Sequence, residues 1–174
     1  MNRTLRLWIV SSIIILFGMP LAAAQETYVP LFVIERNTNA NVVRYEAKLR
    51  DGKLDPREPV IAYWLLASEG GKRQELNFLE KYKAYGFNVR PDGHGESFLL
   101  TIVSDKKKEI HIFRDGPTVR AAAHIGTCNA YLEKVVVALN KKFSVISLPE
   151  YADMIGRDVN TGAKCTERVT PAER

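Results

Sequence analysis

The fold is decided by an alternating stretch, VVRYEAKL, at residues 42–49. Apolar side chains occupy every second position, namely Val43, Tyr45, Ala47 and Leu49, and the charged side chains of Arg44, Glu46 and Lys48 lie between them. Successive side chains of a β-strand point to opposite faces, so one face of this strand is apolar and the other is in water. The stretch therefore predicts a half-buried strand of an antiparallel sheet.

The same period of two, or a short apolar run between turn signals, recurs along most of the chain. We expect further strands over Leu31–Glu35, Val60–Ala67, Phe98–Val103, Glu109–Arg114, Val119–Ile125, Tyr131–Leu139, Phe143–Leu148 and Cys165–Val169. The almost wholly apolar run 60–67 is typical of a central strand. Turn residues separate the strands at intervals of roughly eight to twelve residues, which predicts a mainly β fold, an antiparallel β-sandwich or barrel.

One stretch, residues 74–85, has a helical period instead. Its apolar side chains that fall at helical spacing are Phe78, Leu79, Tyr82 and Tyr85. We expect one short helix packed on the sheet, with this aromatic stripe covering the open side or end of the sheet. Gly86 follows at the position where a left-handed C-terminal cap would lie.

Residues 1–24 have the composition of a secretory signal peptide. Arg3 and Arg6 give a basic start, Leu7–Phe17 is apolar except for two serines, and Ala22–Ala24 follows a helix-breaking proline. An uncleaved anchor is the less favoured alternative, because a spanning helix needs about 20 mainly apolar residues. We therefore predict cleavage after residue 24, one globular domain over residues 25–174, a periplasmic or secreted location, and no stable membrane insertion after cleavage.

Composition and charge narrow the classes of function. The 174 residues are 46% hydrophobic and 26% charged, the balance of one compact globular domain. Basic residues exceed acidic ones by only 25 to 20 and do not cluster among aromatic residues. No nucleic-acid partner is therefore expected.

Cys128 and Cys165 are the only two cysteines of the chain. In an exported protein they are expected to form a disulfide, with two separated thiols as the alternative. Neither has a second Cys or a His at ligand spacing, so we expect no zinc site, and nothing else in the sequence indicates a metal or cofactor.

No motif marks a reactive site. The sequence has no G-x-S-x-G elbow, and the three histidines share no ligand motif. The candidates for a binding site are instead polar and aromatic residues around the expected helix, namely Tyr63, Trp64, Glu69, Arg73 and Tyr85.

Each of these candidates has a structural interpretation as well as a functional one. Tyr63 and Trp64 point to opposite faces of one strand, so only one enters the core, and the other could stack on a sugar or a peptide or be covered by the helix. Glu69 and Glu80 bracket Arg73, and such ion pairs could orient a site or simply fix the helix on the sheet, which is the commoner case.

Several segments together resemble a known family. They are Leu31–Arg36, Gly52–Pro56, Tyr63–Trp64, Ala84–Gly86 and Pro149–Tyr151. They are similar to a bacterial exported family known as domain of unknown function 4833, and the resemblance spans nearly the whole mature chain, most specifically residues 31–90. It implies export and a single compact domain, and it implies no established activity.

Two functions of different classes remain. The favoured one is a noncatalytic binding or assembly module of the cell envelope, whose partner is an envelope ligand or protein. The alternative is a small hydrolase or lyase that uses carboxylates and His near the helix. A deep pocket joining Glu69, Arg73 and a His would favour the enzyme, and a shallow aromatic groove would favour the binding module.

Overall fold

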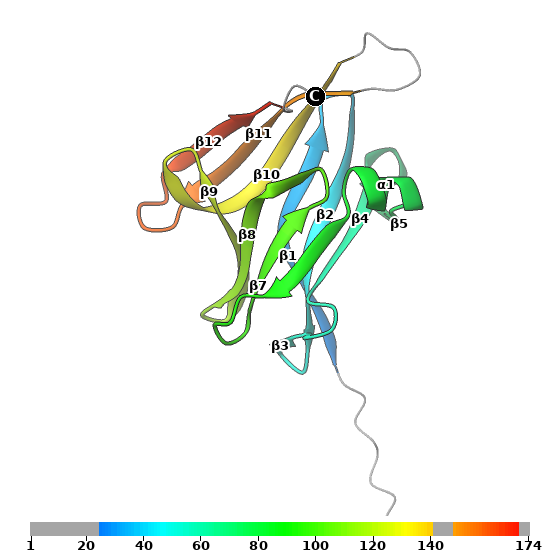
Figure 1. The fold of residues 1–174 in the computed structure, drawn as a ribbon. Helices are drawn as coiled ribbons and strands as arrows, with labels where there is room; N and C mark the ends of the chain where they lie inside the picture. Colours follow the sequence, from blue (N-terminus) through cyan, green and yellow to red (C-terminus); the bar gives the residue numbers. More distant parts are fainter. Residues whose placement is uncertain (1–24, 141–147, 171–174) are drawn as a thin grey trace, which may run out of the picture.

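The computed structural model describes residues 25–140 and 148–170 (Figure 1). The predicted signal peptide and nearly all of the predicted strand Phe143–Leu148 lie outside the described residues. Within them the protein is mainly β, with one α-helix, α1 (Phe78–Lys83), and one 3-10 helix, η1 (Ala67–Glu69). No helix in this part of the chain is long and apolar enough to cross a membrane.

The strands of the described residues join one twelve-stranded sheet. They are β1 (Glu26–Arg36), β2 (Asn39–Arg50), β3 (Lys53–Leu54), β4 (Val60–Leu66), β5 (Lys72–Glu75), β6 (Phe87–Pro91), β7 (Ser97–Ile102), β8 (Asp105–Asp115), β9 (Thr118–Ile125), β10 (Cys128–Asn140), β11 (Leu148–Asp158) and β12 (Lys164–Val169).

The sheet curls into an open half-barrel. Nine strands follow one path in the order β5-β4-β2-β1-β10-β9-β8-β7-β6, while β11 and β12 extend from β10 and β3 pairs with β2. The chain segment that contains α1 connects β5 to β6, and so it runs from one end of the path to the other (Figure 1). The prediction of a mainly β fold with one short helix is confirmed, and its observed form is this curled, open sheet.

β10 sets the curl because it changes partners along one edge. Its residues 128–131 pair antiparallel with β9, and its residues 134–137 pair parallel with residues 33–36 of β1. The opposite edge pairs with β11, where a register shift between Leu132 and Lys134 accompanies the change. Two groups of strands therefore diverge from β10. We name them the β1 limb (β1, β2, β4 and β5) and the β9 limb (β6–β9).

The parallel β1–β10 pair corrects the expectation of a wholly antiparallel sheet. Every other strand pair of the described residues is antiparallel. Parallel neighbours need a long connection, and here the whole chain from β2 to β9 lies between the two strands. No local pattern in the sequence predicts such a parallel pairing.

The apolar core fills the space between the two limbs. The ring of Tyr45 on β2 stacks on Phe32 of β1 at 4.4 Å between centroids and reaches Phe87 of β6 at 5.8 Å. Tyr45 is completely buried, and its hydroxyl donates a hydrogen bond to the Tyr85 carbonyl oxygen at 2.6 Å. Burial raises the pKa of Tyr45 far above its usual value, so this hydroxyl remains a donor.

The helix is shorter than predicted, because Gln74 and Glu75 belong to β5. It begins at a capping box in which the Asn77 side chain accepts from the Glu80 N–H and the Glu80 carboxylate accepts from the Asn77 N–H. These two bonds satisfy amides that otherwise lack partners at a helix start. A polar cap at Asn77 therefore fixes where the helix begins.

The predicted left-handed cap at Gly86 is wrong, because this glycine has no positive φ. A Cβ at position 86 would lie 1.7 Å from the Lys81 carbonyl oxygen. Glycine is required here for the close approach of two backbone segments at the helix end.

The predicted aromatic stripe mostly faces away from the sheet, which corrects the expectation that it covers the open side. Phe78, Leu79 and Tyr82 are 77%, 67% and 63% exposed. The residues that do pack on the core flank the helix: Leu76 is buried, and the Tyr85 ring lies 5.1 Å from the Trp64 ring. A six-residue helix held at both ends by such contacts leaves its own apolar side in solvent.

The predicted disulfide is confirmed. Cys128 at the start of β10 is bonded to Cys165 on β12, with Cα atoms 6.3 Å apart. It links strands that are not neighbours in the sheet, because β11 lies between them. The bond therefore holds β12 to the part of the molecule where β9 and β10 meet.

We expect Gly156→Ala to lower the free energy of unfolding by about 3 kcal/mol, the upper end of the usual cost of overpacking. A Cβ at this β11 position would lie 2.4 Å from the Tyr131 carbonyl oxygen and 2.9 Å from Ile125 Cδ1, so backbone must move. Urea denaturation measures the change. Arg157→Ala, at the exposed neighbouring residue, is the control, and equal stability of the two variants would contradict the prediction.

Reduction of the disulfide is expected to cost roughly 2–4 kcal/mol of stability, because it frees a long loop in the unfolded chain. Chemical denaturation with and without reductant measures this, and a Cys128→Ser, Cys165→Ser variant should not respond to the reductant. Complete alkylation of both thiols in unreduced, unfolded protein would refute the bond.

Candidate binding cleft

The sequence-derived candidates lie on both faces of β4. Tyr63 lies on the face of β4 opposite the core cluster and is nevertheless buried, with the Arg73 guanidinium covering its ring at 4.0 Å from the centroid. Arg73 also pairs with Glu75 on the same strand, at 3.0 Å between Nη2 and Oε1. The outer ring is therefore occupied by a neighbouring side chain of β5 rather than presented as an open platform.

Trp64 points inward, as the alternation of β4 requires, so the prediction that these neighbours take opposite faces is confirmed. Its ring packs on Tyr85, and the Arg36 guanidinium lies 4.5 Å from the Trp64 ring centroid. Arg36 also hydrogen-bonds Tyr85, whose pKa is raised chiefly by burial. Trp64 and Tyr85 thus belong to the interior near the helix.

Glu69 and Arg73 do not pair with each other. Glu69 lies in η1 and binds the Lys72 ammonium at 2.9 Å, whereas Arg73 binds Glu75. The strand β5, which the sequence did not predict, sends alternate side chains to different sides and separates the two groups. The five candidates therefore do not converge on one cavity, and their role in ligand binding stays a prediction.

A cleft of about 1400 Å³ lies elsewhere, on the outer face of the β9 limb. It is bounded by the β6–β7 loop, by β8 and β9, and by β12, and no residue of α1 lines it. All three histidines of the chain, His94, His111 and His124, line this cleft. Sequence reasoning missed it because the three come from a loop and two different strands.

The floor of the cleft follows from strand register. Leu99 on β7, His111 on β8, Ala122 on β9 and Tyr131 on β10 lie side by side across the sheet. Of this row, His111 and Ala122 line the cleft, and Ala122 contributes only a methyl group to its floor. His111 rises from the floor with its side chain 54% exposed.

One end of the cleft is organised around Asp92 in the β6–β7 loop. The Ser97 hydroxyl and the His94 backbone N–H both donate to its carboxylate, and His111 Nδ1 lies 4.0 Å from its second oxygen. The Ser97 hydrogen bond is the main reason that the pKa of Asp92 lies below its usual value, followed by the His94 amide. Because the hydroxyl donates to a carboxylate, it is not activated by an imidazole.

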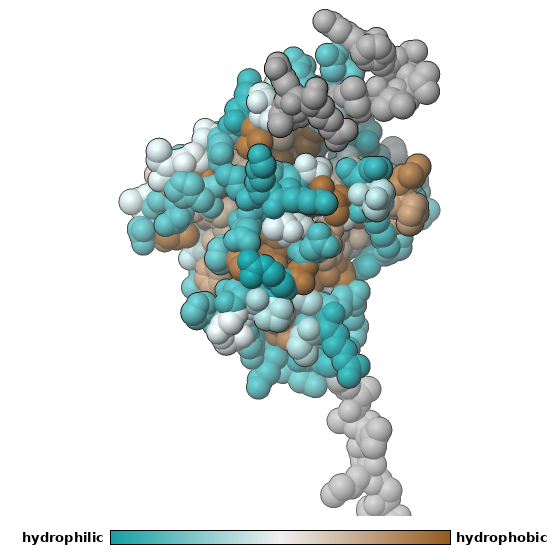
Figure 2. Space-filling model, in the orientation of Figure 1, coloured by the Kyte–Doolittle hydropathy of each residue, from teal (hydrophilic) through white to brown (hydrophobic). Residues whose placement is uncertain are grey.

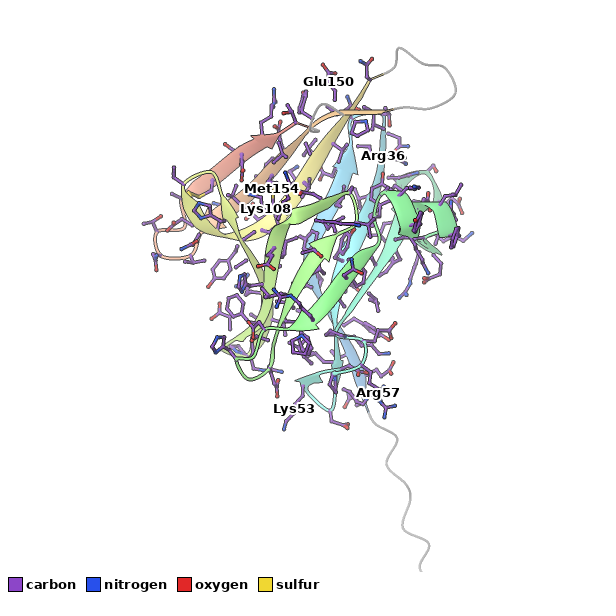
Figure 3. The ribbon with its side chains drawn as sticks, viewed as in Figure 1. Arg36, Lys53, Arg57, Lys108, Glu150 and Met154 are labelled. Carbon is purple, nitrogen blue, oxygen red and sulfur yellow. A yellow bond between two sulfur atoms is a disulfide. The ribbon has the colours of Figure 1, made fainter. Side chains whose placement is uncertain are left out.

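On the opposite side of the cleft, an ion pair holds β12 to β8. Lys108 Nζ lies 2.7 Å from Glu167 Oε2 and also donates to the His124 carbonyl oxygen at 2.9 Å (Figure 3 labels Lys108). Burial acts to raise the pKa of Glu167, but the hydrogen bonds from Lys108 and the Gly126 N–H outweigh it and hold the pKa below its usual value. These contacts hold β12 as a wall of the cleft.

Charges of both signs line the cleft and largely neutralise one another. Besides the Lys108–Glu167 pair, Arg114 Nε lies 3.5 Å from Glu96 Oε2. The lining also includes Asp105, Lys106, Lys107 and Glu109. Such a surface has no strong preference for either a cation or an anion, and it suits a polar ligand that carries both donors and acceptors.

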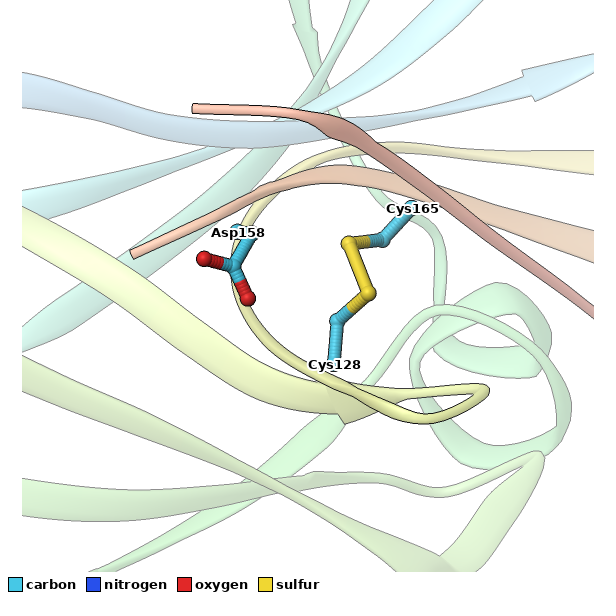
Figure 4. A group of neighbouring side chains, drawn as sticks. All are labelled: Cys128, Asp158 and Cys165. Carbon is cyan, nitrogen blue, oxygen red and sulfur yellow. A yellow bond between two sulfur atoms is a disulfide. The ribbon is translucent and has the colours of Figure 1, made fainter. Parts of the chain in front are cut away.

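Cys128, Asp158 and Cys165 form the one group of potential metal ligands that the described residues bring within 4.8 Å of one another (Figure 4). The two sulfur atoms are bonded to each other, so neither is a thiolate ligand. Asp158 caps the β11–β12 turn, because its Oδ1 accepts from the N–H groups of Asn160 and Thr161. We assign the group a structural role.

Fold and cleft together define a mainly β protein with a large open cleft on the outer face of a curled sheet. The family model described as Domain of unknown function (DUF4833) matches residues 32–168, and the chain belongs to this family. Comparison with curated proteins and with solved structures found no match.

We expect Ser97→Ala to raise the pKa of Asp92 toward the usual carboxyl value, because the variant loses the hydrogen bond that lowers it most. NMR titration of the Asp92 carboxyl measures the change. Asp158 is the internal control, since Thr161 and not Ser97 lowers its pKa. An unchanged Asp92 titration would contradict the geometry.

The same substitution should alter the pH dependence of stability. A carboxyl whose folded pKa lies below its unfolded pKa stabilises the fold at neutral pH, and this contribution is lost as the pH falls through the folded value. With the Asp92 shift reduced, the unfolding free energy of Ser97→Ala, measured by urea denaturation at a series of pH values, should fall less steeply than that of the wild type as the pH drops below about 5.

Proposed function

We propose that the protein is a noncatalytic binding module of the cell envelope, periplasmic or secreted, that holds a polar ligand in the cleft of the β9 limb. The signal-peptide pattern of residues 1–24 supports export. The Cys128–Cys165 disulfide is compatible with an oxidising compartment outside the cytoplasm.

The dimensions of the cleft carry the proposal. At about 1400 Å³ it exceeds the roughly 300–1,000 Å³ of ordinary small-molecule pockets, and it lies open on a sheet face. An open cleft of this size accommodates a segment of an extended polymer better than an enclosed metabolite. The ligand we propose is therefore a segment of a polar envelope polymer, bound through hydrogen bonds to the exposed imidazoles and the charged walls.

Rigid walls support a binding role. The Lys108–Glu167 ion pair and the disulfide fix β12, and the Ser97 and His94 hydrogen bonds fix the Asp92 loop. Side chains already held by such partners lose little conformational freedom on binding a ligand. The cleft is thus organised before the ligand arrives.

The polar chemistry of the cleft also favours binding over nucleophilic catalysis. The Ser97 hydroxyl donates to Asp92, and both cysteines are bonded. The usual serine or thiol mechanism pairs the nucleophile with an imidazole base, and no hydrogen bond of the described lining residues joins Ser97 to a histidine side chain.

One observation favours the alternative, a small hydrolase or lyase. Asp92 lies beside His111 in the cleft, and a carboxylate that orients an imidazole is a common device for general acid–base catalysis. This pairing gathers a His and a carboxylate in the cleft rather than near the helix. The enzyme would use His111 as the base and Asp92 as the group that orients it.

A cleft-filling variant tests the binding proposal. Ala122→Trp places a large side chain on the outward floor position, and we expect it to weaken retention of the native ligand at least tenfold without lowering the melting temperature by more than a few degrees. The ligand is identified by mass spectrometry of material that co-purifies with the wild-type protein, and envelope polymer fragments are then titrated against both proteins.

Gln74→Trp is the matched control, because this exposed residue lies on β5, outside the cleft, and the same large side chain placed there should leave ligand affinity unchanged. Equal binding by Ala122→Trp and wild type would contradict the proposed site. Conversion of the bound polymer to shorter products, abolished by His111→Ala, would establish the enzyme instead.

A further inference from the structure

The exposed large apolar side chains of the described residues concentrate on α1. Only four are exposed in this part of the chain, and Phe78, Leu79 and Tyr82 of this one helix account for three; the fourth, Tyr28, lies on β1. In Figure 2 a small brown group stands at the edge of an otherwise mixed surface, in the position that α1 occupies in Figure 1.

Contacts at both ends of α1 hold this patch, which consists of Phe78, Leu79 and Tyr82, in place. The capping box at Asn77 and Glu80 fixes the start of the helix, and the Phe78 and Tyr82 rings stack with 6.0 Å between centroids and planes 4° apart. Behind the helix, Tyr85 is anchored against Trp64 and the core. The Phe78 and Tyr82 rings therefore lie against each other, and all three apolar side chains stand mostly in solvent.

Unpaired cations border the patch. Lys81 and Lys83 lie in the last turn of α1, and neither forms an ion pair among the described residues. Lys83 Nζ lies 4.6 Å from the centroid of the Tyr82 ring. The neighbouring carboxylates are engaged elsewhere, since Glu80 closes the capping box and Glu75 pairs with Arg73.

The size of the patch argues against a second copy of the chain as its partner. A stable dimer buries about 800 Å² on each subunit, which three side chains of a six-residue helix do not provide. A bilayer surface needs no such area or shape match. Apolar and aromatic side chains enter its interface, and lysines beside them extend to anionic headgroups.

We propose that α1 is a membrane-contact site that docks the protein reversibly on an anionic phospholipid surface. Phe78, Leu79 and Tyr82 enter the headgroup region, and Lys81 and Lys83 bind lipid phosphates. The contact is peripheral, because one short helix leaves the sheet outside the bilayer. It places the protein at a membrane while the cleft, which α1 does not line, remains open to its ligand.

Vesicle co-sedimentation tests the proposal with protein expressed from the full-length sequence, so that every variant carries the same N-terminus. Wild type should bind vesicles of equal phosphatidylglycerol and phosphatidylcholine, with weaker binding to phosphatidylcholine alone. The Phe78→Ser, Leu79→Ser variant should bind at least tenfold more weakly while its thermal melt is unchanged, because both side chains are mostly in solvent. Tyr28→Ser is the matched control and should bind like wild type.

Substitution of the two lysines tests the electrostatic part of the membrane contact separately. Lys81→Gln, Lys83→Gln should reduce binding to the anionic vesicles several-fold and weaken its dependence on salt, since two headgroup ion pairs are removed. Undiminished binding of the Phe78→Ser, Leu79→Ser variant would overturn the proposal. A dimer in analytical ultracentrifugation that this variant dissociates would also overturn it and assign the patch to a second copy.

A fluorescent reporter locates the contact independently. Phe78→Trp is made together with Trp8→Phe, so that the new indole on the exposed side of α1 and the buried Trp64, which gives a constant background, are the only two tryptophans. Anionic vesicles should shift the emission of this variant to shorter wavelength. Sedimentation with vesicles without any emission shift would place the contact on another surface and contradict the assignment to α1.

Discussion

The change of partner along β10 is the constraint on which the rest of the structure depends. One edge of this strand pairs first with β9 and then, after the irregularity near residue 133, with β1 in parallel. A bulge increases local twist, so two limbs leave the same strand in different directions and enclose the core between them. Tyr45 spans that enclosed space, with rings of β1 and β6 on either side. This arrangement requires a glycine at position 156, because β11 passes close to the Tyr131 carbonyl oxygen where the two limbs separate.

The cleft is a consequence of the same arrangement. β9 joins β10 at one edge, whereas β12 is carried on the other edge by β11, and the disulfide and the Lys108–Glu167 pair hold it beside β8 and β9. A wall and a floor that come from opposite edges of one strand are thus fixed relative to each other. The polar side chains of the cleft stand on regular strands, except for the Asp92 loop, which its own hydrogen bonds hold in place.

The sequence predicted correctly those features that depend on residue type or on the spacing of neighbouring residues. The alternating stretch at 42–49 lies within β2, and the two cysteines are bonded. β5 could not be predicted, because all four of its residues are exposed and it has no apolar face. The parallel pairing and the role of glycine at 156 depend on contacts far along the chain. The predicted helix over 74–85 was right only for Phe78–Lys83, and the packing of Leu76 and Tyr85 on the core at its flanks leaves Phe78 in solvent. In the cleft, His111 and His124 occupy outward positions of alternating strands, a signal that the sequence contains but that no spacing motif marks.

The most direct test of this account is a residue-resolved map of backbone nuclear Overhauser contacts along both edges of β10. The partner change predicts antiparallel contacts from residues 128–131 to β9, parallel contacts from residues 134–137 to residues 33–36 of β1, and contacts to β11 along the opposite edge. Continuous pairing of β10 with β9 through residue 137, with no contacts to β1, would contradict it.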